Sequence, residues 1–365
     1  MKFRCERDIL AEAVTTAQRA VGSRSGLPPV LSDLRMTATA DGVELVGSDL
    51  EITNRVHFPA MVEETGIAVI PKILGDIVKK LEPGAVVIAV EGDEARVTGG
   101  KYSTTLRLKA ADDYPRLALA DGNGVRVDSE TLIGALKQVV RVASKDHDRH
   151  LSLTGVLLSA HGGGLRLVAT DSYRLAVRDL KGVSMLPEGK KVLVAAKGLS
   201  EVQRLDSESE IEVVLGEREV AFRNSRAEVV VRLIEGEFPK YEQLIPTGYP
   251  NRLITSKESF LEALDRVSIV GQGRDNANLK ITMSPGAIEM AMVVPDVGSS
   301  EEPIEAKYEG SELTVAFNPQ YLREGVIAIE AEEFVLSTID PLKPATLQAV
   351  DKDDFLYLVM PVRTP

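Results

Sequence analysis

Apolar residues recur at helical spacing in three segments of the chain that lie about 120 residues apart. The segments are RDILAEAVTTAQRAV (7–21), SETLIGALKQVVRVA (129–143) and KESFLEALDRVSIVG (257–271). Their apolar positions are Leu10, Val14 and Ala17 in the first, Leu132, Leu136 and Val139 in the second, and Phe260, Leu264 and Val267 in the third. Each segment also carries an acidic residue near its start, where the helix dipole favours negative charge. The pattern predicts one amphipathic helix that occurs three times.

Further elements follow each of these helices in the same order. Strands begin at Val43, Leu165 and Ile288, second helices align on Leu74, Leu199 and Leu322, and closing strands occupy 95–109, 220–234 and 345–360. We therefore expect an α+β protein of three repeated domains, each with two helices packed on antiparallel sheets. Stretches rich in Gly, Pro or Asn divide it into residues 1–122, 123–249 and 250–365.

The length and composition agree with several globular domains. The chain has 365 residues, of which 44% are hydrophobic and 27% charged. The N-terminus becomes charged at once, and no apolar run reaches the roughly 18 residues of a membrane span. The single cysteine, Cys5, excludes an internal disulfide and fits a reducing compartment. We expect a cytoplasmic protein without membrane contact, in which Cys5 is an inert strand thiol.

Metal and nucleotide chemistry have little support in the sequence. CxxC, HExxH and Walker-type motifs are missing, and the four histidines are scattered, so we expect no metal and no cofactor. The run HGGG at 161–164 takes the place that Asp41-Gly42 has in the first repeat. It therefore predicts a hairpin turn and not a phosphate cradle.

The net charge of −12 argues against nucleic acid unless the positive charges are gathered on one surface. With Leu132 at zero and about 100° per residue, Lys137, Arg141 and Lys145 fall about 140° to 220° away, opposite the apolar face. Similar positions on the other helices are basic too. The full set is Arg19, Arg24, Lys72, Lys79, Lys137, Arg141, Lys145, Arg149, Lys197 and Arg204. In an acidic chain this set favours a shared surface that faces an anionic partner.

The segments MKFRCERDILAEAV, VELVGSDLEI, LVATDSYRLAV, EGEFPKYEQLIP and YLVMPVR occur in an order and spacing that resembles the β sliding clamps of bacterial replicative DNA polymerase. The resemblance extends over essentially the whole chain. It implies a non-enzymatic processivity factor: a head-to-tail homodimer whose six domains form a ring around duplex DNA, without sequence preference. The implied protein partners are the replicative DNA polymerase subunit, the clamp loader, and other clamp-binding polymerases and repair proteins.

The same resemblance implies a pocket for short partner peptides between the second and third domains. Its residues would be Leu153, Thr170, Ser172, Tyr173, Arg174, Leu175, Pro239, Leu244, Leu358, Met360, Pro361 and Val362. The apolar members would hold a Leu or Phe anchor, while hydroxyl groups and Arg174 would fix the peptide backbone. Gln243 replaces an expected basic residue, and Ser172-Tyr173 replaces a smaller pair. These differences, and the tail Thr364-Pro365, leave the peptide preference open.

At the dimer interface the resemblance implies that Leu106 of one subunit faces Ile269 and Val270 of the other. Ile269 supports this independently, because an isoleucine on the outward side of its helix is unusual for a solvated position. Neither the stability of the dimer nor the choice between a main replication clamp and a specialised paralogue follows from the sequence.

Two alternatives stay open at this point. One is a peptide-binding scaffold that does not encircle DNA, which a sedimentation mass of one chain would favour. The other is an enzyme centred on Asp171, Ser172 and Tyr173. The first repeat keeps Ser48-Asp49 at the equivalent corner, which indicates turn chemistry in preference to catalysis, and the third repeat places that corner at 293–294.

Overall fold

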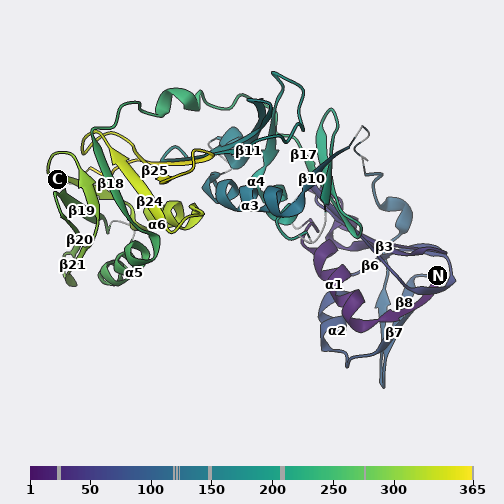
Figure 1. Ribbon diagram of the computed structural model, residues 1–365. Coiled ribbons are helices and arrows are strands. Elements are labelled where there is room, and N and C mark those ends of the chain that lie inside the picture. Colours follow the sequence, from purple (N-terminus) through teal and green to yellow (C-terminus); the bar gives the residue numbers. More distant parts are fainter. Residues whose placement is uncertain are drawn as a thin grey trace. The chain divides into compact units, whose positions relative to one another are not determined.

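The computed structural model describes residues 1–22, 26–117, 120, 122, 124–146, 150–205, 210–274 and 277–363. The chain forms two compact units (Figure 1). Unit 1 consists of Met1–Ile133 and Lys197–Leu233, and unit 2 of Gly134–Ala196 and Ile234–Pro365. The units differ from the three predicted repeats because each unit contains a large sheet that combines strands of two repeats. Within the described ranges, every helix is too short or too polar to cross a lipid bilayer.

Unit 1 contains two antiparallel sheets. The five-stranded sheet has the order β5 (Met61–Glu64), β1 (Lys2–Glu6), β7 (Ala85–Glu91), β8 (Glu94–Gly99), β9 (Tyr102–Arg107). The eight-stranded sheet has the order β10 (Val125–Asp128), β15 (Glu210–Leu215), β16 (Glu219–Arg223), β17 (Ala227–Arg232), β4 (Ile52–Phe58), β3 (Gly42–Ser48), β2 (Leu34–Thr39), β6 (Gly66–Ile70). Helix α1 (Arg7–Gln18) packs on β3, β4 and α2 (Leu74–Lys80), and so contacts β4, the strand of the first repeat that pairs with the second repeat.

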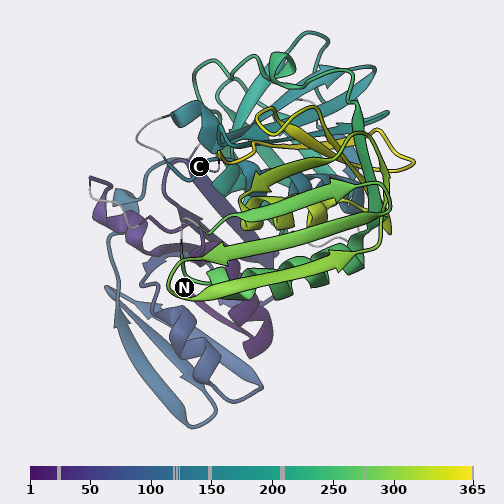
Figure 2. The ribbon, with the colours of Figure 1, turned by 90° about the vertical axis from the view of Figure 1, so that its left-hand side faces the viewer.

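Unit 2 also contains one large and one small antiparallel sheet. Its nine-stranded sheet has the order β14 (Lys191–Ala195), β11 (Gly155–His161), β12 (Gly164–Thr170), β13 (Arg174–Leu180), β26 (Phe355–Val359), β25 (Ala345–Ala349), β24 (Glu333–Thr338), β18 (Asn251–Ser256), β22 (Lys307–Glu309). Its four-stranded sheet has the order β21 (Gly298–Ile304), β20 (Ala287–Val294), β19 (Leu279–Ser284), β23 (Leu313–Phe317). Helix α5 (Lys257–Ser268) contacts β20, β21 and α6 (Pro319–Ala328). Figure 2 shows the light-green strands of the smaller sheet side by side at the front.

The three predicted amphipathic helices are confirmed. They are α1, α3 (Ser129–Val139) and α5, and all nine of their predicted apolar positions are buried. The second helices are α2, α4 (Ala196–Val202) and α6. The chain passes between the two units inside α3, at the start of α4 and after β17, between Leu233 and Ile234. Short 3₁₀ segments complete the described helices: η1 (Pro29–Ser32), η2 (Ala111–Asp113), η3 (Val140–Val142), η4 (Leu151–Thr154), η5 (Tyr241–Leu244) and η6 (Ile269–Gly271).

One helical prediction is wrong. Lys145 lies beyond η3 and not on the helix that carries Lys137. The α-helix changes to a tighter 3₁₀ turn after Val139, so an advance of about 100° per residue no longer applies there. Lys137 and Arg141 are exposed as predicted, but they do not form a helical stripe with Lys145.

Two local predictions are confirmed. Gly162 and Gly163 have φ angles of 56° and 74° and join β11 to β12, as a two-residue hairpin turn of type I′ requires. Cys5 is buried in β1 inside the apolar core of unit 1. Burial, with a smaller effect of Glu6, raises the pKa of its thiol to about 12, which keeps the group protonated and unreactive at neutral pH.

Candidate functional site

The polar residues 170–174 form a tight turn between β12 and β13. Asp171 Oδ1 accepts hydrogen bonds from the backbone N–H groups of Tyr173 and Arg174, both at 3.0 Å. Ser172 lies between them in the left-handed conformation, with φ 77°. The hydroxyl of Thr170 donates to the Arg174 carbonyl at 2.7 Å and accepts from the Ser172 N–H at 3.2 Å. These bonds make the corner an Asx turn, with its polar groups directed at its own backbone.

The first repeat has the same turn. Asp49 Oδ1 accepts bonds from the N–H groups of Glu51 at 3.1 Å and Ile52 at 2.8 Å. Leu50 takes the left-handed conformation there, with φ 69°. The prediction that this part of the polar cluster is repeated turn chemistry is therefore confirmed.

The third repeat keeps the turn without the carboxylate. Strand β20 ends at Val294, and Asp296 has φ 67°, so Pro295 occupies the place of Asp49 and Asp171. The predicted position of this corner, residues 293–294, is one residue too early. Proline has no side-chain acceptor, so the turn at 294–298 lacks the Asx bonds of the other two.

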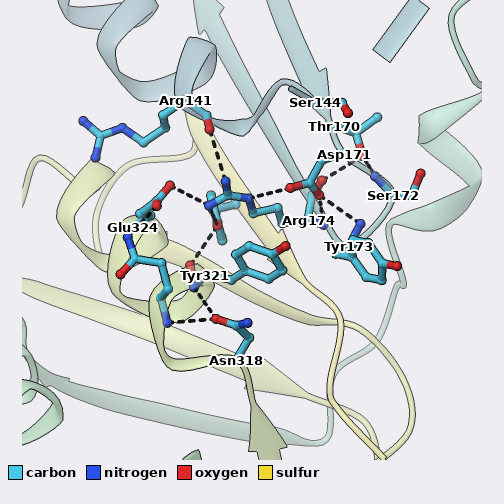
Figure 3. A network of polar contacts seen from close by, with 12 residues as sticks. Arg141, Ser144, Thr170, Asp171, Ser172, Tyr173, Arg174, Asn318, Tyr321 and Glu324 are labelled. Atoms are coloured by element: carbon cyan, nitrogen blue, oxygen red, sulfur yellow. Dashed lines mark hydrogen bonds and ion pairs between the residues drawn. The ribbon is translucent and has the colours of Figure 1, made fainter. Parts of the chain in front are cut away.

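Arg174 connects this corner to the third repeat (Figure 3). Its guanidinium is buried and donates to Asp171 Oδ2 at 2.9 Å, Glu324 Oε2 at 2.6 Å, Tyr357 Oη at 3.4 Å and the Arg141 carbonyl at 3.2 Å. Burial lowers its pKa, but Tyr357, Glu324 and Asp171 together raise the pKa above the usual value for arginine. Four of the five N–H donors of the guanidinium are thus used inside the chain, which leaves little for a partner's backbone.

An aromatic pair covers the same guanidinium. The Tyr321 ring centroid lies 4.4 Å from Arg174 Cζ, and the Tyr173 ring stacks on Tyr321 with centroids 6.2 Å apart. Tyr357 donates its hydroxyl to the Tyr321 carbonyl at 2.8 Å. Tyr173 is 61% exposed, so it presents an aromatic face at the surface. Tyr321, on which it stacks, is fixed by its contacts with Arg174 and Tyr357.

Next to this network lies a cleft of 650 Å³. It is lined by Ala143, Ser144, Lys145, Asp146, His150, Leu153, Asp171, Ser172, Tyr173, Arg174, Gln320, Tyr321 and Glu324. Four of the predicted peptide-pocket residues contribute to it, together with Lys145, which was predicted to face DNA. The residues of α6 were missed from sequence. The spacing of Gln320 and Glu324, which hydrogen-bond to each other at 2.7 Å, was the available signal.

Two of the other predicted pocket residues belong to an apolar cluster of unit 2. Leu175 and Leu358 face each other across β13 and β26, and both are buried. The strand end continues into the corner, since the Met360 N–H donates to the Tyr173 carbonyl at 2.8 Å. Met360 and Leu244 are exposed by 37% and 49%. Pro239 is also exposed, and Pro361 and Val362 are half-buried.

In unit 1 the predicted DNA-facing residues fall into two groups. Lys72 and Lys79 are exposed. Arg19 instead forms an ion pair with Glu201 at 2.5 Å, and Lys197 forms one with Asp49 at 2.7 Å. Arg204 Nε lies 3.7 Å from Glu201 Oε1, the same carboxylate that pairs with Arg19. Part of the positive charge predicted for this surface is therefore neutralised within the unit.

In unit 2, Lys137 and Arg141 are exposed, and Arg141 Nε donates to the Lys137 carbonyl at 2.9 Å. Figure 3 shows the Arg141 side chain directed away from Arg174. In the third repeat Arg323 pairs with Asp265 at 2.7 Å, so α6 adds little free positive charge. The predicted residues Arg24 and Arg149 and the tail 364–365 lie outside the described residues. Within the described part of the chain, no group of three or more His, Cys, Asp or Glu is arranged to hold a metal ion.

Known families match all three repeats. The N-terminal, central and C-terminal domains of the DNA polymerase III beta subunit match residues 1–118, 126–240 and 242–363. The chain belongs to the DNA polymerase III beta subunit family. Its function is therefore that of a DNA clamp in replication, and its fold is three repeated clamp domains.

Relatives of this clamp match it along its whole length. It is 33% identical to the beta sliding clamp of Streptomyces coelicolor, over 100% of this chain and 99% of that protein. It is 30% identical to the beta sliding clamp of Bacillus subtilis, over 100% of both. The crystal structure of the Bacillus subtilis sliding clamp superposes with a TM-score of 0.93 at 29% identity, and that of the DNA polymerase III beta subunit from Thermotoga maritima with 0.90 at 26%, each over 100% of both chains.

Proposed function

We propose that the chain forms a head-to-tail homodimer whose ring encircles duplex DNA and tethers replication and repair proteins through their short peptides. The three repeats, residues 1–122, 123–249 and 250–365, would be the domains that alternate around this ring, in agreement with the three matched family domains. One observation carries the proposal. The same strand junction joins the first repeat to the second and the second repeat to the third, and the two strands that would form a third such junction lie at free sheet edges in the first and third repeats.

Both internal junctions have the same register. Strand β4 of the first repeat pairs with β17 of the second, and Ile52 lies opposite Val231. Strand β13 of the second repeat pairs with β26 of the third, and Arg174 lies opposite Val359. Ile52 and Arg174 are each the first residue of a strand that follows the repeated turn. Both pairs are antiparallel, so each repeat meets the next one in the same way.

The hydrogen bond at the start of the junction is also repeated. The Arg232 N–H donates to the Glu51 carbonyl at 2.8 Å, and the Met360 N–H donates to the Tyr173 carbonyl at 2.8 Å. The same rule, applied once more, would pair β21 of the third repeat with β9 of the first repeat in another copy. Both are edge strands of their sheets. A closed head-to-tail ring would cover these edges, which are otherwise prone to aggregation.

The side chains at the two edges fit this pairing. Ile269, Val293 and Val297 are exposed by 65%, 64% and 51%, and all three lie at the β20–β21 edge of unit 2. Leu106 lies on β9 and is half-buried in its own unit. By the common register Leu106 would lie opposite Gly298 of the other copy. Apolar side chains from both edges would then be removed from water.

The basic residues that remain exposed support contact with DNA. Lys72, Lys79, Lys137 and Arg141 offer cations to phosphate groups, and such contacts carry no sequence information. Weak and exchangeable contacts suit a ring that slides, because retention comes from topology. The surplus acid of a chain with net charge −12 would lie elsewhere on the ring and repel stray DNA.

The corner in unit 2 supports peptide binding. Met360 is exposed and donates its backbone N–H to the Tyr173 carbonyl at the edge of the polar cleft. Leu244 is exposed at the end of η5, whose Tyr241 belongs to the same apolar cluster as Leu175 and Leu358. An apolar anchor buried there contributes roughly 2–3 kcal/mol before ordering costs, which gives modest affinity suited to exchange. The partners would be the replicative polymerase subunit, the clamp loader, and other clamp-binding polymerases and repair proteins, in the cytoplasm.

Catalysis at the polar corner has no place in this proposal. Both oxygens of the Asp171 carboxylate accept hydrogen bonds from Arg174, and Oδ1 also accepts one from Tyr173. A carboxylate held in this way serves the turn and the arginine. We therefore propose a clamp that acts by holding other proteins on DNA and performs no reaction of its own.

Sedimentation equilibrium of Ile269→Asp tests the ring. The wild type should sediment at twice the chain mass of 39.5 kDa. The dissociation constant of the variant dimer should be about tenfold higher or more, because burying a charge at an apolar contact costs more than about 1.4 kcal/mol. Leu342→Asp, at a residue that is 62% exposed in the same unit, is the matched control and should stay dimeric. A wild type that sediments as a single chain would favour the scaffold without a ring.

A further inference from the structure

A second cleft lies at the other internal junction, within unit 1. It measures 240 Å³ and sits where β4 pairs with β17. Its apolar walls are Leu50, Leu117 and Val230. Its polar walls include the exposed residues Arg116, Arg218 and Arg232.

This cleft is the structural counterpart of the peptide corner in unit 2. Thr53 and Val230 face each other across β4 and β17, as Leu175 and Leu358 do across β13 and β26. Arg232 takes the place of Met360, because each donates the backbone N–H that closes its junction. The repeated turn thus builds the same kind of corner twice, with different side chains.

The exchange of side chains changes the chemistry of the corner. Where the unit 2 corner offers Met360, this one offers a guanidinium, with Arg116 and Arg218 beside it. Within the part of the chain that the structure describes, these three side chains form no ion pair. Glu51 and Glu219 also line the cleft, so cations outnumber anions by one in a chain of net charge −12.

The apolar part of the cleft is small and its rim is charged. A volume of 240 Å³ is below the roughly 300–1,000 Å³ of pockets for drug-sized ligands, so it suits one side chain of a peptide. Leu50 lines the cleft, is 43% exposed, and has a left-handed backbone with φ 69°. The turn therefore keeps an apolar side chain at the surface next to the three arginines.

We propose that this cleft binds a short acidic peptide segment of a partner protein, with one apolar side chain between Leu50, Leu117 and Val230. Carboxylates that flank the apolar residue pair with Arg116, Arg218 and Arg232, since guanidinium groups bind carboxylates in a bidentate manner. The inference rests on the proposed peptide corner in unit 2 only through the equivalence of the two junctions. The clamp would then hold one peptide at each of the two junctions inside one chain.

The test uses the full-length protein and a fluorescein-labelled probe of sequence Gly-Glu-Asp-Leu-Asp-Glu-Gly. Fluorescence anisotropy should show binding that the double variant Arg218→Glu, Arg232→Glu weakens about tenfold or more. The matched control is the double variant Arg96→Glu, Lys101→Glu, which makes the same change of charge at exposed residues of the same unit outside the lining of the cleft, and it should leave the affinity for this probe unchanged. Circular dichroism of each variant checks that the fold is retained.

A photoreactive leucine in the probe locates the bound peptide by mass spectrometry. Cross-links at residues 50, 117 or 230 support the proposal. Cross-links near residues 244 or 360, equal binding of the neutral analogue Gly-Gln-Asn-Leu-Asn-Gln-Gly, or no binding up to about 1 mM would each overturn it. Any of these results leaves the ring and the unit 2 peptide corner intact, since those depend on Ile269 and Met360.

Discussion

At the scale of single residues, one aspartate has two different partners in two copies of the same turn. Asp49 pairs with Lys197, and Asp171 pairs with Arg174. The turn itself was predictable, because an aspartate that bonds its own backbone is a local feature and recurs in the sequence. The partner Glu324 was not, because it lies 150 positions from Arg174 and no local pattern connects them.

Removing the Arg174 guanidinium should destabilise the protein. In Arg174→Met, the carboxylates of Asp171 and Glu324 lose their common cation in a site where their side chains are only 13% and 21% exposed. We expect a loss of about 3 kcal/mol in the free energy of unfolding, measured with urea. Adding Glu324→Gln should recover part of the lost free energy of unfolding, because it removes one of the two unpaired carboxylates. A double-mutant cycle measures this recovery.

The neighbouring residue provides the control for this prediction. Arg323 pairs with Asp265 at the surface, so Arg323→Met should cost less than about 1 kcal/mol. Equal losses in the two methionine variants would mean that the buried network contributes no more than a surface ion pair.

At the scale of elements, the helices were the most predictable part of the fold. Their apolar faces follow directly from spacing, as Leu132, Leu136 and Val139 show. The state of their basic residues was not predictable. Arg19 is neutralised by Glu201, which is 182 positions away, and the position of Lys145 depends on a 3₁₀ turn that periodicity does not reveal. Charge can be assigned to a helix face from sequence, but its pairing depends on the tertiary fold.

This difference should appear in the salt dependence of DNA binding. Replacing the exposed Lys79 and Lys137 with alanine should reduce the slope of log K against log salt by about 1.8 per subunit, or about 3.6 for the proposed dimer, if each lysine contacts one phosphate. Lys197→Ala should change the slope less, because that ammonium group is held by Asp49. Fluorescence anisotropy with a labelled duplex measures the slope for the wild type and for each variant. Arg323→Ala is the control, because Arg323 is paired with Asp265. Equal slopes for the double variant and the wild type would mean that Lys79 and Lys137 do not contact DNA.

At the scale of the whole molecule, the repeat makes the architecture predictable and the strand pairing makes it specific. The sequence shows three copies of one domain, but it does not show which strands join them. The structure supplies that rule twice, at β4–β17 and at β13–β26. The same pairing, applied to the free edges, gives the proposed contact between β21 of one copy and β9 of another. An interface between molecules can therefore be inferred from junctions inside one chain. The acidic net charge is compatible with DNA binding only if the proposed ring separates its charges between surfaces.

A ring held by topology makes a prediction that binding energy alone does not. Clamps loaded on circular duplex DNA should remain bound at salt concentrations that weaken phosphate contacts, and should be lost within minutes once the circle is cut. Gel filtration of labelled protein on intact and linearised DNA measures the difference. Ile269→Asp, which should open the proposed closure at the β21 edge, should be lost from both forms. Equal retention of the wild type on circular and linear DNA would mean that ionic contact holds the protein there, because a surface-bound protein does not detect the ends of the duplex.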